Sequence, residues 1–172
     1  MSFPQSDPIL ELVSFPAYPN LSDLPILAHE KPSYNNIAST RLGNFDYVFC
    51  HDGMDKSIWL VRIDAKNHSA ETVVKSMVIG PDDDALFVYD DELRPLAASS
   101  WKEENEVHVY YLSSDHHLRE LYSKDQGCTW KPGQVNELDV EVLENTGISA
   151  FGSPEPEIHC VTHESIITCF RY

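Results

Sequence analysis

The sequence lacks three features that would assign it at once to a secreted, membrane or metal-binding class. None of its hydrophobic runs approaches the roughly 18 apolar residues of a membrane-spanning helix. Its first residues contain no basic stretch followed by an apolar run, so no secretory signal is predicted. Its four cysteines show no CxxC spacing, which favours free thiols over a disulfide framework or a zinc site. These absences predict a cytoplasmic protein.

Basic residues are also few. Twelve Lys and Arg face 28 Asp and Glu, for a formal net charge of −16. A phosphate backbone or an anionic membrane would be repelled, so neither nucleic acid nor a membrane is expected as a partner. The chain contains no Ser-His-Asp arrangement, HExxH, P-loop or glycine-rich nucleotide motif. We therefore expect no metal and no cofactor.

The length and composition are those of one globular domain, with 172 residues of which 42% are hydrophobic. Residues 1–36 are rich in proline, which breaks helices. We interpret them as an extended arm with one short apolar run, Ile9 to Phe15, that could form an exchanged strand. Residues 37–172 are predicted to hold the folded blades described next.

After residue 36 the chain alternates short apolar runs with Asp, Gly, Asn and Ser, and no window shows a sustained helical period. This pattern predicts an all-β chain of about ten short strands. The runs are DYVFCH, SIWLVRI, TVVKSMVI, ALFVY, PLAASSW, EVHVYYL, HLRELYS, ISAF, EIHCV and SIITCFRY.

These runs repeat as a unit. PLAASSW, EVHVYYL, HLRELYS and GCTW form one copy, and ISAF, EIHCV and SIITCF repeat its first three parts. His159 follows His108 by 51 residues, and Tyr47 precedes His108 by 61. A four-stranded unit that recurs every 50 to 60 residues predicts a β-propeller of about three blades per chain.

Three blades cannot close a ring, and an open ring leaves strand edges that invite pairing. Two explanations remain open at this point. Two chains could complete a six-bladed ring as a homodimer, which we favour. Alternatively, the strand of the N-terminal arm could supply the missing fourth strand of the last unit and leave the ring open.

The stretch PLAASSW with EVHVYYLSSDHHLRELYSKDQGCTWKPG resembles one blade of the fungal fucose-specific lectins of the orange-peel-fungus type. The resemblance is best over residues 95–133 and fainter over 37–80 and 147–172. It implies a six-bladed propeller with sugar sites between blades, each built from an arginine, a glutamate and a tryptophan wall. His108 stands at the arginine position, Glu120 at the glutamate position, and Trp101 and Trp130 at those of the tryptophans.

The other two units depart further from the lectin pattern. The arginine and glutamate positions read Tyr47 and Leu60 in the first unit, and His159 and Thr168 in the third. No unit therefore keeps the Arg–Glu clamp, and each lost charged hydrogen bond would cost about 1.5–3 kcal/mol of affinity.

Two function hypotheses follow. The favoured one is a fungal natural-product enzyme of the dehydrating cyclase or hetero-Diels–Alderase kind, an idea that rests on analogy of fold. The alternative is a fucose-type lectin with an altered clamp; a scaffold or storage protein is a third. The candidate acid–base residues are His108, Glu120 and His159. The candidate ligand-binding residues, for an apolar or aromatic intermediate or a sugar, are Trp101, Tyr110, Trp130, Tyr47 and Trp59.

Each of these residues also has a structural interpretation. The two histidines could point into a blade and bond to its backbone, Glu120 could be a solvated strand residue, and the tryptophans could belong to the core. Only the direction in which each side chain points separates these alternatives from a binding site.

Overall fold

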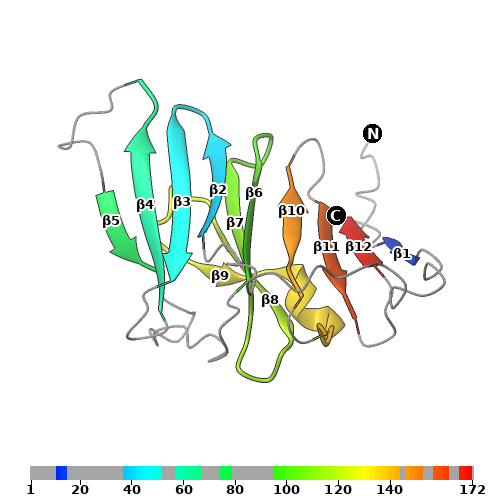
Figure 1. The fold of residues 1–172 in the computed structure, drawn as a ribbon. Helices are drawn as coiled ribbons and strands as arrows, with labels where there is room; N and C mark the ends of the chain where they lie inside the picture. The colour runs from blue at the N-terminus through cyan, green and yellow to red at the C-terminus, as the bar shows by residue number, and fades with distance from the viewer. Residues whose placement is uncertain are drawn as a thin grey trace, which may run out of the picture.

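The computed structural model describes residues 11–14, 37–51, 57–66, 74–78, 95–143, 146–152, 157–162 and 167–171, and only the backbone of 11–14 and 167–171. These residues form three antiparallel sheets of four strands each (Figure 1). The prediction of an all-β chain with about three four-stranded units is confirmed. The described part of the chain contains no helix that is long and apolar enough to cross a bilayer.

The first two sheets each follow the chain in simple order. The first consists of β2 (Ile37–Leu42), β3 (Phe45–His51), β4 (Ile58–Asp64) and β5 (Val74–Met77). The second consists of β6 (Leu96–Trp101), β7 (Glu106–Leu112), β8 (Leu118–Ser123) and β9 (Lys131–Pro132). A short 3-10 helix, η3 (Gln134–Leu138), follows β9.

The third sheet joins the two ends of the described chain. Its order is β1-β12-β11-β10, with β10 (Ser149–Phe151), β11 (Glu157–Val161), β12 (Ile167–Arg171) and β1 (Glu11–Ser14). The short apolar run of the arm therefore forms a strand and supplies the fourth strand of the last unit. It does so within its own chain, where Glu11 lies opposite Arg171 and Ser14 opposite Thr168.

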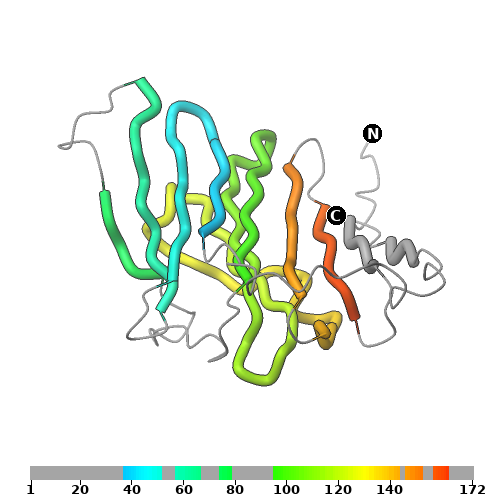
Figure 2. The backbone as a smooth tube through the Cα atoms, in the orientation of Figure 1, coloured from blue at the N-terminus to red at the C-terminus, as the bar shows by residue number. Residues whose placement is uncertain are grey.

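The second sheet lies between the other two (Figure 2). Because successive side chains of a strand point to opposite faces, β7 contributes to both interfaces. Val107, Val109 and Tyr111 belong to a core shared with the first sheet. Tyr110 and Leu112 belong to a second core, shared with Ile158 and Cys160 of the third sheet and with others.

The cysteines follow the sequence-based expectation where their side chains are described. Cys50, Cys128 and Cys160 are free thiols. Burial raises the pKa of Cys160 to about 12, so this thiol is protonated and unreactive at neutral pH. The side chain of Cys169 lies outside the described part.

Candidate functional site

A cavity of about 370 Å³ opens on the face of the second sheet that points toward the third sheet. All of its lining residues fall between positions 101 and 137, the part of the chain in which the lectin resemblance is best. They include two aromatic side chains, four carboxylates and two cations: Trp101 and Tyr122; Glu104, Glu106, Glu120 and Glu137; His108 and Lys124. We call this space the His108 cavity.

Strand periodicity and register bring these groups together. On β7 the period of two places Glu106 and His108 on the face opposite Val107. The register of β7 with β8 sets His108 opposite Tyr122, and Glu120 opposite the residue two positions further along β7. His108 and Glu120 are therefore diagonal neighbours, within reach of each other across the strand pair.

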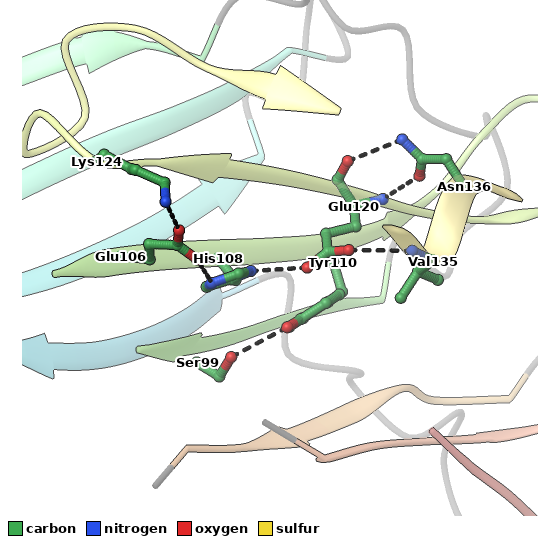
Figure 3. Close-up of polar contacts among 8 residues, drawn as sticks. All are labelled: Ser99, Glu106, His108, Tyr110, Glu120, Lys124, Val135 and Asn136. Carbon is green, nitrogen blue, oxygen red and sulfur yellow. Dashed lines mark hydrogen bonds and ion pairs between the residues drawn. The ribbon is translucent and has the colours of Figure 1, made fainter. Parts of the chain in front are cut away.

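A chain of polar contacts runs through the cavity wall (Figure 3). The Lys124 ammonium pairs with Oε1 of Glu106. His108 bridges two carboxylates, with Nε2 at 3.0 Å from Oε2 of Glu106 and Nδ1 at 2.7 Å from Oε1 of Glu120. The backbone N–H of Val135 donates to Oε2 of Glu120 at 3.2 Å. Both ring nitrogens of His108 and both carboxylate oxygens of Glu120 are thus engaged.

Glu120 is fixed from its backbone as well as from its side chain, and it is 0% exposed. The amide of Asn136 brackets its main chain, accepting from N–H at 2.7 Å and donating to C=O at 3.1 Å. Gly133 N–H donates to the same C=O at 3.0 Å. A β-carbon at Gly133 would lie 2.0 Å from Oε2 of Glu120, so the close approach of this turn requires glycine.

The contacts of His108 determine its charge. Burial lowers its pKa, but the hydrogen bonds and charges of Glu106 and Glu120 outweigh burial and raise the pKa above its ordinary value. Burial raises the pKa of Glu106. The hydrogen bonds and charges of His108 and Lys124 lower this pKa by more than burial raises it, so the net shift is downward. These contacts favour the imidazolium form of His108, which donates through both nitrogens.

The raised pKa of His108 predicts that stability falls as pH rises. In the unfolded chain the histidine titrates at about 6.5, so its contribution is complete below that pH and is lost as pH rises through the folded-state pKa. Urea unfolding at pH 5 to 9 should show this decline for the wild type. His108→Gln should show a flatter profile, and an equal decline in both proteins would contradict the prediction.

The charged lining determines what the cavity can offer a ligand. The donors of His108 are used inside the wall and Lys124 is paired, whereas carboxylate oxygens and the aromatic side chains of Trp101 and Tyr122 remain at the surface of the cavity. The site is rich in acceptors and suits a ligand that brings hydroxyl or N–H donors. Within the described residues, no group of three or more His, Cys, Asp or Glu could hold a metal ion.

The structure unites three of the predicted site residues. His108, Glu120 and Trp101 all line the cavity. Tyr110 is fully buried behind it, with its hydroxyl 3.1 Å from Oγ of Ser99. The His108 ring lies nearly parallel to that of Tyr110, at 6.2 Å between centroids and 14° between planes. Tyr110 thus supports the histidine and does not line the cavity.

Three of the predicted ligand-binding aromatics lie elsewhere. Tyr47 and Trp130 belong to the core between the first and second sheets, where Trp130 packs edge-on against Phe49 at 5.7 Å. Trp59 alternates with the core residues of β4 and so lies on the other face of the first sheet, with the Lys75 ammonium 4.3 Å above its ring. For Trp130 the structural interpretation applies, because it packs in the core, and Tyr47 packs in the same core.

His159 is not near His108. It lies on β11, on the face of the third sheet that points away from the second, because Ile158 and Cys160 take the inner face. Its Nε2 is 3.5 Å from Oε2 of Glu157, and its ring meets Phe151 edge-on. The register sets His159 opposite Cys169 and Val161 opposite Ile167. The position equivalent to Glu120 is therefore Ile167, one residue before the Thr168 that sequence spacing assigned.

Sequence reasoning missed Glu106, Tyr122 and Lys124. A signal for the first two was present, since Glu106 precedes His108 by two residues and Tyr122 follows Glu120 by two, which is the spacing of one strand face. Lys124 and Gly133 lie beyond the ends of their strands, where alternation no longer predicts direction.

Three successive four-stranded antiparallel sheets are the arrangement of the blades of a β-propeller. No protein-family model and no curated protein matches the sequence. Solved structures do match, with fungal fucose lectins among them. The predicted likeness to lectins of this type is confirmed at the level of fold.

Three of these structures give the scale of the likeness. AofleA from Arthrobotrys oligospora, with three arginine-to-alanine substitutions, superposes with a TM-score of 0.61 at 21% identity, covering 79% of this chain and 38% of that one. SapL1 lectin in complex with α-methyl fucoside gives a TM-score of 0.59 at 17% identity, covering 81% of this chain and 42% of the lectin. The six-bladed Aleuria aurantia lectin gives a TM-score of 0.50 at 21% identity, covering 72% of this chain and 39% of the lectin. The chain thus matches about two-fifths of the length of each lectin, and identities this low establish the fold alone.

Proposed function

We propose that this protein is a carbohydrate-binding module whose His108 cavity holds one hydroxylated ring. The observation that carries the proposal is the contact of 2.7 Å between His108 and Glu120. It sets a cation and a carboxylate side by side where the resemblance to fungal lectins implies an arginine and a glutamate. The solved structures with this fold include lectins complexed with α-methyl fucoside and with Fucα1-6GlcNAc.

The chemistry of the lining supports a sugar-like ligand. Ring hydroxyls donate to carboxylate oxygens through charge-assisted hydrogen bonds, and four glutamates line the cavity. Trp101 is half-buried at the edge of the cavity, where its ring can cover the apolar face of a sugar. His108 then acts as an organising cation that holds the two carboxylates at a fixed separation.

The dehydrating-cyclase hypothesis gains no support from these contacts. That chemistry needs an unengaged acid–base group and a predominantly apolar pocket, whereas both ring nitrogens of His108 are engaged and four glutamates line the cavity. His159, the other candidate base, lies on a different sheet. The enzyme hypothesis, the scaffold alternative and the cytoplasmic location stay predictions.

Titration with methyl α-L-fucoside by calorimetry tests the proposal. We expect saturable binding that Trp101→Ala weakens about tenfold, since stacking of this kind contributes up to about 1.5 kcal/mol. Trp101→Phe, which keeps an aromatic face, should restore most of the affinity. If a glycan array and the titration detect no sugar bound to the folded protein, the proposal is wrong.

We also propose that two copies close a six-bladed ring. Each end sheet of the chain turns one face away from the second sheet, and each such face carries a large exposed apolar side chain. Ile37 on β2 and Phe151 on β10 are both 59% exposed. Within the chain, faces of this kind are covered by the next sheet, and a second copy would cover both ends by the same packing.

His159 lies on the same outer face of the third sheet as Phe151. A sheet of the partner that covers this face would therefore also complete a site around His159. Light scattering should give twice the chain mass for the wild type. Ile37→Asp and Phe151→Asp should each give a folded monomer, because an aspartate would be buried unpaired at the interface. A monomeric wild type at high concentration would refute the dimer and leave the sugar proposal unaffected.

A further inference from the structure

A second cavity, of about 290 Å³, lies between the first sheet and a loop of the second sheet. Leu60 and Arg62 of β4 form its floor, Val74 and Ser76 of β5 one side, and the loop residues from Gln126 to Cys128 the far wall. We call it the Arg62 cavity. None of the candidate ligand-binding or acid–base residues lines it.

This cavity occupies, on the first sheet, the place that the His108 cavity occupies on the second. In the strand register Leu60 lies opposite Phe49, and Glu120 lies opposite Tyr110, so Leu60 is the equivalent of Glu120. Arg62 lies opposite Tyr47, and Tyr122 lies opposite His108, so Arg62 is the equivalent of Tyr122. At equivalent places one cavity therefore has a buried carboxylate and the other a buried leucine.

The charge of the two cavities is opposite. Four glutamates line the first. Among the described residues that line the second, Arg62 is the only charged one. The chain has 28 acidic and 12 basic residues and a net charge of −16. Average composition would therefore not place a positive charge alone among the described lining residues of a cavity.

Arg62 is held in place while part of its hydrogen-bonding capacity stays free. Its Nη1 donates to the backbone C=O of Gln126 at 2.9 Å and to Oε1 of the same residue at 3.3 Å. Its guanidinium carbon lies 5.2 Å from the centre of the Phe45 ring. Within the described chain, neither Nε nor Nη2 has a hydrogen-bond partner, and no carboxylate pairs with Arg62. Three N–H donors, one on Nε and two on Nη2, therefore remain for a ligand.

The far wall is rigid as well as close. Asp125 accepts from the N–H groups of Cys128 and Thr129 at 3.1 and 2.8 Å, which fixes the loop. Gly127 has a φ of +86°, and a β-carbon there would lie 2.3 Å from Cδ2 of Leu60. The loop thus packs directly on the floor of the cavity, and a ligand meets a preformed shape.

We propose that the Arg62 cavity binds the carboxylate of a small acidic ligand about the size of one sugar ring. A planar guanidinium matches a carboxylate in a two-point contact, which a neutral hydroxyl cannot reproduce. The apolar side chain of Leu60 reduces solvation around that contact and strengthens it. The volume lies just below the roughly 300–1,000 Å³ of small-ligand pockets, which limits the ligand to a single ring.

Calorimetry with D-glucuronate against D-glucose tests the proposal, in about 0.15 M salt so that the long-range repulsion by the acidic protein is screened. We expect saturable glucuronate binding and at least about tenfold weaker glucose binding, the difference that a charge-assisted hydrogen bond makes. Arg62→Gln should lose this preference. Backbone NMR shifts should appear at Gly127 and Cys128 and not at Gly133.

A matched pair of variants guards against a loss of folding. Val74 lies opposite Arg62 on the edge strand β5 and is 46% exposed, so polar substitutions there are tolerated. Val74→Glu puts a carboxylate beside the guanidinium and should remove glucuronate binding, whereas Val74→Gln should retain it. Equal affinity for glucuronate and glucose, or glucuronate binding unchanged in Val74→Glu, would overturn the proposal. Sugar binding in the His108 cavity would stand in either case.

Discussion

Replacing Glu120 with alanine is expected to abolish sugar binding and to lower the free energy of unfolding by about 3 kcal/mol. The substitution removes one member of a buried ion pair, which typically costs about 3–5 kcal/mol because the remaining charge is left uncompensated. We expect the lower end of that range, because His108 keeps its bond to Glu106 at 3.0 Å. Urea unfolding at pH 7 and a fucoside titration measure the two effects.

Glu104 offers a matched control. It lines the same cavity but is exposed at the turn between β6 and β7. Glu104→Ala should change stability by no more than about 0.5 kcal/mol, as surface substitutions usually do. If Glu120→Ala were as stable as Glu104→Ala, the buried pair would not be the structural centre of the second sheet, and the proposed site would lose its basis.

Gly133→Ala is expected to act on the same site through a steric clash. The added β-carbon would lie 2.0 Å from Oε2 and 2.1 Å from Cδ of Glu120. Glu120 cannot move away without losing hydrogen bonds, because His108 and the N–H of Val135 hold its two oxygens. We expect a loss of about 1–3 kcal/mol, the usual cost of overpacking, together with weaker sugar binding.

Gly147 serves as the control for this substitution. A β-carbon there meets nothing within 4 Å, so Gly147→Ala should be neutral, or stabilising by about 0.4–1 kcal/mol through the lower entropy of the unfolded chain. Unfolding curves for the two variants separate the steric effect from the general effect of removing a glycine. Similar stabilities would show that the turn after β9 adjusts without moving Glu120.

Local sequence was enough for most of the described strands and for the faces of the second sheet. The predicted strand ALFVY lies outside the described residues, and the fourth strand of the second unit is Lys131–Pro132 and not GCTW. Val107 and Val109 alternate with Glu106 and His108, and this period of two is a property of the extended backbone itself. The sequence repeat likewise identified Tyr47 and His159 as equivalents of His108, which the strand registers confirm. The spacing failed by one residue at Thr168, because the length of the loop between strands differs from unit to unit.

The destination of each aromatic side chain could not be predicted in this way. Trp101 lines a cavity and Trp130 packs in a core, although both follow apolar strands of the same unit. Alternation says which face a side chain joins, but what covers that face depends on the neighbouring sheet, which is distant in sequence. The same limit applied to the N-terminal arm, whose strand pairs with β12 at the other end of the chain.

By itself, therefore, the sequence determined a chain of short strands in repeated units, with His108 and Glu120 on one face of the second unit. Only the tertiary structure decided that these two side chains meet at 2.7 Å, that Glu106 and Lys124 join them, and that Arg62 is the only charged residue among the described ones that line its cavity. The physical reason is that burial and charge pairing depend on the register of the strands and on packing between sheets. Both arise from contacts between residues far apart in the chain.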